Sequence, residues 1–131
     1  MINLDQVRAQ RAFDKATHVS SPNSGIDSKE YLGLARSLPA MFQNNGLLAT
    51  WAFMLSKKDK NHFNALLKAL LDHFRDPQIN LGTSQADVVR VFTDDWTGPQ
   101  PLDGTQLMRL TSEAIAFSGW LKRAAEALCD K

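Results

Sequence analysis

The sequence contains a single cysteine, Cys129, and no apolar run long enough to span a bilayer. One thiol can neither form an internal disulfide nor anchor a metal alone. We therefore expect Cys129 to be a free thiol near a fraying terminus rather than a catalytic nucleophile. The first ten residues, MINLDQVRAQ, lack the apolar centre of a signal peptide. These features favour a cytoplasmic protein with no membrane partner.

The motifs of common active sites are also missing. None of His18, His62 and His73 has another histidine or a cysteine at metal-ligand spacing. His62 and His73 would stand about 16 Å apart on one helix, too far to share an ion. The seven glycines are scattered and form no phosphate-binding loop, and there is no G-x-S-x-G nucleophile motif. We expect no enzyme activity, no cofactor and no metal site.

Chain length and net charge limit the classes of protein to which this sequence can belong. A chain of 131 residues is long enough for one domain with its own core, and we expect residues 1–131 to form a single helical domain. The net charge of +1 excludes a polycation, but residues 1–60 carry a net +3 and residues 61–131 a net −2. A site for a polyanion would therefore be a local patch.

The spacing of apolar residues predicts an all-α bundle of five to six helices, with no pair of strands. Five helix starts are indicated by capping residues, and Pro77 should end the third helix. The expected starts are Asn3, Asp27 or Ser28, Asp59, Ser84 and residues 103–105. The first helix should end near His18 and the last near Leu128. The segment 97–104 is predicted to be a loop.

The stretch from Tyr31 to Lys57 is the most apolar part of the chain. Within it, Leu47–Leu55 is apolar on nearly every side, which is typical of a helix buried all round. We expect residues 47–56 to form the central helix of the bundle. Pro39 predicts a kink or break in this stretch, and Gly46 can adopt the left-handed backbone between two helices.

The last helix carries an apolar stripe with alternating spacings of three and four residues. Its members are Leu107, Leu110, Ala114, Phe117, Leu121, Ala124 and Leu128. Leu107 and Leu110, together with Trp96 in a polar segment, are candidates for a protein interface. Glu113 lies beside this stripe and would need a partner if buried. Gly119 lies in the middle of this helix, where glycine is unfavourable. Either packing requires a small residue at this position or the helix is weak there.

Three sets of basic residues could bind a polyanion, although charge alone is a weak signal for nucleic acid. Arg8, Arg11 and Lys15 fall at i, i+3 and i+7, which puts them on one helix face. The second set is Lys57, Lys58 and Lys60, and the third is Lys122 with Arg123. We expect these side chains to be exposed, although a merely solvated face would show the same pattern.

Two long blocks resemble the small α-helical subunit of the type III-B CRISPR effector complex (the Cmr complex). LARSLPAMFQNNGLLATWAFMLSK at 34–57 is similar to that family's "LARRLPxMIxxNGLxxALAFLxxK" block, and TSEAIAFSGWLKRAAEAL at 111–128 to its closing "TxEALxFLxWLKRFAEA" block. LDQVRAQRAFDKA at 4–16 is similar to its opening helix. Gly119 and Ala124 depart from the family pattern, which has larger residues there, and residues 77–105 show little similarity.

The resemblance implies an all-helical subunit without catalytic activity. Such subunits stack in several copies beside the crRNA-bearing backbone subunits, in a complex with a large subunit, and help to build the groove that holds target RNA. The resemblance therefore implies that the three basic sets are candidate RNA contacts. A helical protein–protein adaptor without a nucleic-acid role is an alternative. The equivalent small subunit of a type III-A or type I complex is another, which only the partners distinguish.

Overall fold

The computed structural model describes residues 3–74, 76 and 104–129, and every regular element among them is an α-helix. The four helices are α1 (Leu4–Ser20), α2 (Ser28–Leu55), α3 (Asn61–Phe74) and α5 (Gly104–Leu128). The predicted all-α class is confirmed. The short helix expected from Ser84 lies outside the described residues, so the count of five to six differs from the four helices seen.

The first two helix starts lie where the capping residues place them. The Asn3 side chain accepts a hydrogen bond from the Asp5 amide, and Asp27 accepts from the amides of Lys29 and Glu30. Each contact satisfies backbone donors that have no partner inside the helix. The third helix begins at Asn61, one residue later than an N-cap at Asp59 predicts, because residues 56–60 form a turn.

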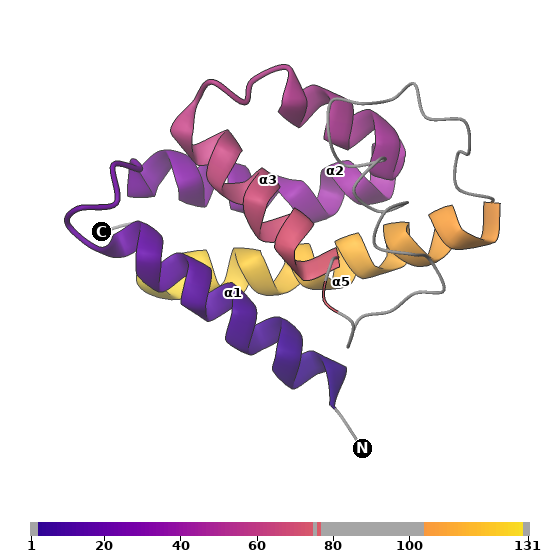
Figure 1. The fold of residues 1–131 in the computed structure, drawn as a ribbon, viewed down its shortest axis with the longest axis horizontal. Coiled ribbons are helices and arrows are strands. Elements are labelled where there is room, and N and C mark those ends of the chain that lie inside the picture. Colours follow the sequence, from indigo (N-terminus) through magenta and orange to yellow (C-terminus); the bar gives the residue numbers. More distant parts are fainter. Residues whose placement is uncertain (1–2, 75, 77–103, 130–131) are drawn as a thin grey trace.

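The break within α2 lies at Gly46 and not at Pro39. Gly46 has φ +83° and ψ 171°, whereas the backbone on either side of it, Pro39 included, is helical. A positive φ is readily adopted only by glycine. Beside the break, the buried Thr50 hydroxyl donates a 3.0 Å hydrogen bond to the Met41 carbonyl. Figure 1 shows the two parts of α2 running in different directions.

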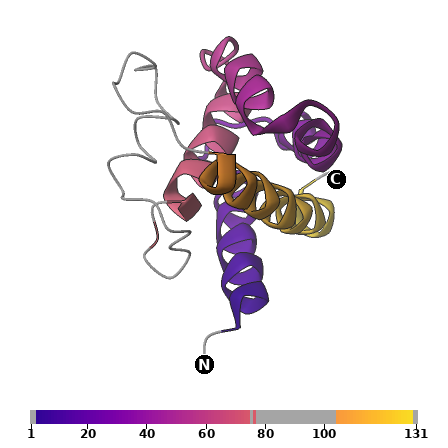
Figure 2. The same ribbon diagram turned by 90° about the vertical axis from the view of Figure 1, so that its right-hand side faces the viewer.

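The central helix among those described is α5, with α2 and α1 packed against it. The end-on view in Figure 2 shows α5 between α1, α2 and α3. Its predicted stripe is buried from Leu110 to Ala124, while Leu107 is half-buried and Leu128 is exposed. Cys129 is buried rather than frayed, and this burial raises the pKa of its thiol.

The expectation that residues 47–56 form a helix buried on all sides is wrong. Leu47, Trp51 and Met54 are buried against the core, but the opposite side of this helix is open. Leu48 is 37% exposed and Phe53 42% exposed. The helix is apolar on both sides, although among the described residues only one side is buried, so apolar composition alone does not identify a helix buried all round.

Candidate functional site

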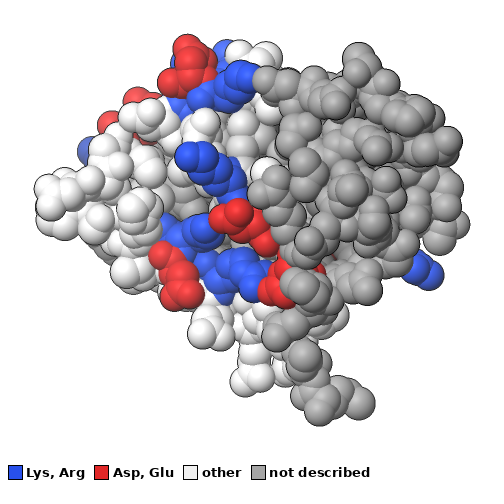
Figure 3. All heavy atoms as spheres, in the orientation of Figure 1, with Lys and Arg blue, Asp and Glu red and all other residues white. Residues whose placement is uncertain are grey.

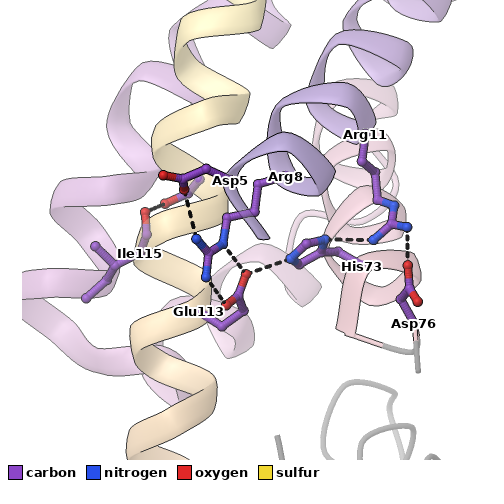
Figure 4. A network of polar contacts seen from close by, with 8 residues as sticks. Asp5, Arg8, Arg11, His73, Asp76, Glu113 and Ile115 are labelled. Carbon is purple, nitrogen blue, oxygen red and sulfur yellow. Dashed lines mark hydrogen bonds and ion pairs between the residues drawn. The ribbon is translucent and has the colours of Figure 1, made fainter. Parts of the chain in front are cut away.

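The most connected polar cluster in the described part of the chain joins α1, α3 and α5 (Figure 4). The Arg8 guanidinium donates two hydrogen bonds of 2.7 Å to the two carboxylate oxygens of Glu113. Glu113 also lies 2.8 Å from Nε2 of His73, and Arg11 lies 2.9 Å from Nδ1 of the same ring. Arg11 forms an ion pair with Asp76 as well.

The geometry fixes the protonation of His73. A guanidinium can only donate hydrogen bonds, so Nδ1 of His73 must accept from Arg11 and carries no proton. The ring proton therefore lies on Nε2, from which it is donated to Glu113. Protonating Nδ1 would point a hydrogen at the Arg11 guanidinium. The arrangement holds a neutral imidazole between a carboxylate and a cation.

Burial and pairing act in opposite directions on the groups of this cluster. Burial lowers the pKa of His73 and, with the two arginines, outweighs the Glu113 carboxylate that would raise it. Burial alone would raise the pKa of Glu113, but hydrogen bonds from Arg8 and His73 lower it to about 2. The hydrogen bond to Glu113 raises the pKa of Arg8 despite burial. The cluster is thus a charged carboxylate held by one arginine and a neutral histidine.

The expected exposure of the cationic face of α1 is wrong for two of its three residues. The Arg8 side chain is 17% exposed and the Arg11 side chain 24% exposed, and both point at internal partners. The third residue, Lys15, is more open and forms a 3.0 Å ion pair with Asp72 of α3. The expectation that a buried Glu113 forms an ion pair is confirmed.

This cluster was missed from the sequence because its members are far apart in the chain. Arg8 and Glu113 are 105 residues apart, and Arg11 and Asp76 are 65 residues apart. One signal was present, however. His73 falls three residues after Leu70 and seven after Leu66, on the apolar face of α3, so a buried histidine that needs partners could have been predicted.

The other two basic sets are more open. Lys58 and Lys60 are exposed in the turn after α2, and Lys57 lies over the Phe53 ring at 5.8 Å from its centroid. Arg123 is exposed and stacks over Trp120 at 4.9 Å, beside the half-buried Lys122. On the face shown in Figure 3, basic and acidic side chains alternate, so this face has no uniform positive field.

Two of the three interface candidates have a place in the described structure. Leu110 is fully buried in the core, so the expectation of an interface role for it is corrected: it packs within the chain. Leu107 is half-buried against the same core. Trp96 lies outside the described residues.

An exposed apolar surface lies instead on the second part of α2. Leu48, Ala49, Ala52 and Phe53 are exposed and fall at i, i+1, i+4 and i+5, which places them on one helix face. Phe53 meets the Phe63 ring edge-on, with centroids 5.8 Å apart. We call these four residues the α2 face. A contiguous apolar surface of this kind is typical of a site where another protein binds.

Two features are absent from the described part of the chain. No set of three histidine, cysteine or carboxylate side chains is placed to bind a metal within residues 3–74, 76 and 104–129. Over the same ranges, no helix is long and apolar enough to cross a membrane.

The fold and the buried cluster first define the class of protein. In its described part the chain is an all-α protein in which buried charged groups join three helices. Comparison with known proteins identifies the family. The model for "CRISPR-associated protein (Cas_Cmr5)" matches residues 4–128, and the chain therefore belongs to this family. The protein "CRISPR system Cmr subunit Cmr5" of Thermus thermophilus is 29% identical over 133 residues, covering all of both chains. The family predicted from residues 4–16, 34–57 and 111–128 is confirmed.

Proposed function

We propose that the chain is a non-catalytic small subunit of a type III-B CRISPR ribonucleoprotein, the Cmr complex, in the cytoplasm. In this proposal it stacks with copies of itself and with the backbone subunits, next to the large subunit, and helps to hold target RNA opposite the crRNA. The observation that carries the proposal is the family match across residues 4–128. The name of the Thermus relative, a Cmr subunit, favours this complex over a type III-A or type I assembly.

The α2 face supports the assembly part of the proposal. Leu48 and Phe53 are large apolar side chains that the chain itself leaves exposed. Burying such a surface against a neighbouring subunit contributes about 25 cal/mol for each Å² removed from water. The α2 face is therefore the proposed subunit contact, and it replaces Leu110 as the interface candidate.

The open basic residues support the RNA part. Arg8 and Arg11 were candidates, but their guanidinium groups are committed to Glu113, His73 and Asp76. The proposed RNA contacts are therefore the remaining candidates: Lys15, Lys57, Lys58, Lys60, Lys122 and Arg123. Each phosphate contacted on single-stranded RNA contributes about −0.7 to the slope of log K against log salt concentration.

The first experiment tests assembly. The complex is purified through a tagged backbone subunit, and this chain is measured in the purified material. Phe53→Asp is expected to lower its incorporation strongly, because a carboxylate would replace the largest apolar side chain of the α2 face. Gln43→Asp, which also adds a carboxylate at an exposed position of α2, is the matched control. Equal incorporation of the two variants would exclude the α2 face as a contact.

The second experiment tests RNA retention. Replacing Lys57, Lys58 and Lys60 together by alanine should reduce the salt dependence of target-RNA binding by the assembled complex. An unchanged slope, with normal incorporation, would show that this turn does not contact RNA. Normal assembly with no RNA in the purified complex would instead favour the adaptor function.

A further inference from the structure

A cavity of about 410 Å³ opens between α1, the loop after it, and α3. Its walls include Lys15 and His18 of α1 and Asn64 and Lys68 of α3. Pockets for small ligands commonly enclose roughly 300–1,000 Å³. None of Arg8, His73 and Glu113 lines the cavity.

The inner wall of this cavity is apolar. Val19 and Tyr31 are almost completely buried, and Ile26 and Ala65 are half-buried beside them. Tyr31 and Val19 are only 1% and 2% exposed, so the apolar surface open to a ligand comes from Ile26 and Ala65. A small apolar surface of this kind suits a planar, weakly hydrated group such as a nucleobase.

The rim carries two lysines from different helices and one carboxylate, that of Asp72. Lys15 and Lys68 line the cavity from α1 and α3, and Lys68 forms no ion pair with any residue in the described ranges. Lys15 pairs with Asp72, but both side chains are open to solvent, and an exposed pair of this kind is weak. A phosphate group can therefore compete with Asp72 for Lys15 and also bind Lys68. His18, exposed on the same rim, adds a ring nitrogen.

Two asparagines complete the lining with oriented amides. The Asn61 side-chain nitrogen donates to the Gly25 carbonyl at 2.9 Å, and that of Asn64 donates to the Lys58 carbonyl at 3.4 Å. These bonds hold the two amide planes and leave the carboxamide oxygens to accept hydrogen bonds from a ligand. The amino and imino groups of nucleobases are donors of that kind.

We propose that this cavity binds one unstacked nucleotide of single-stranded RNA, with the base against Ile26 and Ala65 and the phosphate between Lys15 and Lys68. The inference rests on the proposed function, because it specifies which part of the RNA this surface takes. It also changes the role of the cationic face of α1. Only its third member, Lys15, contacts RNA, and it does so together with α3 rather than with Arg8 and Arg11.

The test uses the full chain labelled with ¹⁵N and titrated with uridine or adenosine monophosphate. Uridine and inorganic phosphate are titrated separately as the two halves of the ligand. Amide shifts are expected at residues 15–19 and 61–72 with the monophosphates, and smaller shifts with either half. Lys68→Ala should weaken binding severalfold, while Arg109→Ala, at an exposed position of α5 outside the cavity, should leave it unchanged. Equal binding of phosphate and nucleotide, or no shifts in these ranges, would overturn the proposal.

A second variant distinguishes RNA binding in the cavity from general attraction of RNA to positively charged side chains. Ala65→Phe places a ring in the cavity and leaves every charge in place. The assembled complex should then hold target RNA more weakly with an unchanged salt slope, whereas Lys68→Ala should reduce the slope by about 0.7. Thermal unfolding checks that Ala65→Phe folds. If this variant does not fold, the effect of Lys68→Ala on the salt slope tests whether the cavity binds RNA.

The two proposals fail in different ways. If the chain shows no nucleotide shifts while the variant at Lys57, Lys58 and Lys60 still lowers the salt slope, the cavity is not an RNA site and the proposed function stands. If the chain shows no nucleotide shifts and the variant at Lys57, Lys58 and Lys60 leaves the salt slope unchanged, the proposed RNA role fails as well.

Discussion

His73 lies flat on Phe117, with ring centroids 3.8 Å apart and ring planes 5° from parallel. Both side chains are fully buried, and both nitrogens of the imidazole are hydrogen bonded to charged groups. The ring thus contacts the apolar core with its face and the ionic cluster with its edge. Since α1, α3 and α5 all contribute to this arrangement, we infer that it fixes the position of α1 on the bundle.

Removing Glu113 is expected to destabilise the chain strongly. Glu113→Ala leaves the Arg8 guanidinium without its main partner and the His73 proton without an acceptor. Breaking a buried ion pair from one side typically costs about 3–5 kcal/mol. Urea unfolding of the purified chain measures the change. Glu126→Ala, which removes an exposed partner of Arg36, is the matched control and should cost less than about 1 kcal/mol. Similar losses from the two variants would contradict a structural role for the cluster.

The stability of the chain should fall in acid, in two steps. The pKa of His73 is lower in the folded chain than its ordinary 6.5, so the unfolded chain binds more protons and stability falls as pH drops below about 6.5. The pKa of Glu113 is lowered from 4.5 to about 2, so its contribution is present above about 4.5 and is lost between there and about 2. Unfolding free energies measured from pH 8 to pH 3 test both steps.

Replacing His73 by glutamine should remove the first of these steps. A glutamine side chain can accept from Arg11 with its oxygen and donate to Glu113 with its nitrogen, as the neutral imidazole does, and it does not titrate. We expect His73→Gln to be less stable at pH 8, because the stacking on Phe117 is lost. Its stability should nevertheless change less than that of the wild type between pH 7 and pH 5. A parallel pH profile would exclude His73 as the titrating group.

Two glycines should respond to alanine in opposite directions. At Gly119 an added Cβ would lie 3.9 Å from the Arg123 guanidinium, an ordinary contact, so Gly119→Ala should stabilise α5 by about 0.5–1 kcal/mol. At Gly46 the backbone has φ +83°, which alanine adopts only with strain, so Gly46→Ala should destabilise by more than about 1 kcal/mol. The melting temperatures of the two variants test this prediction. If both temperatures rise or both fall, the backbone conformations of Gly46 and Gly119 described above are contradicted.

The helices could be predicted from the sequence where local chemistry decides them. Asp27 caps α2 through its neighbours' amides, and the stripe from Leu110 to Ala124 needs only the helical period to be recognised. The chain also carried two blocks long enough to indicate its family. None of these features depends on where distant parts of the chain meet.

What could not be predicted depends on tertiary contacts. Leu47 and Leu48 are chemically identical neighbours, yet one is buried and the other exposed, because only one side of α2 meets α5. Arg8 and Lys15 share a predicted face, but Arg8 lies opposite Glu113 of α5. The sequence shows which residues are charged, and the packing of the helices decides which charges are left for a ligand.

The central claim is that Arg8 is a structural residue and that RNA is held by other cations. The double variant Arg8→Gln, Glu113→Gln removes one charge of each sign, keeps the net charge, and leaves amides that can still pair with each other and with His73. The measurement is the salt dependence of target-RNA binding by the assembled complex carrying this variant, once its incorporation is shown to be normal. We predict the wild-type slope. A slope reduced by about 0.7, the value for one lost phosphate contact, would contradict the claim.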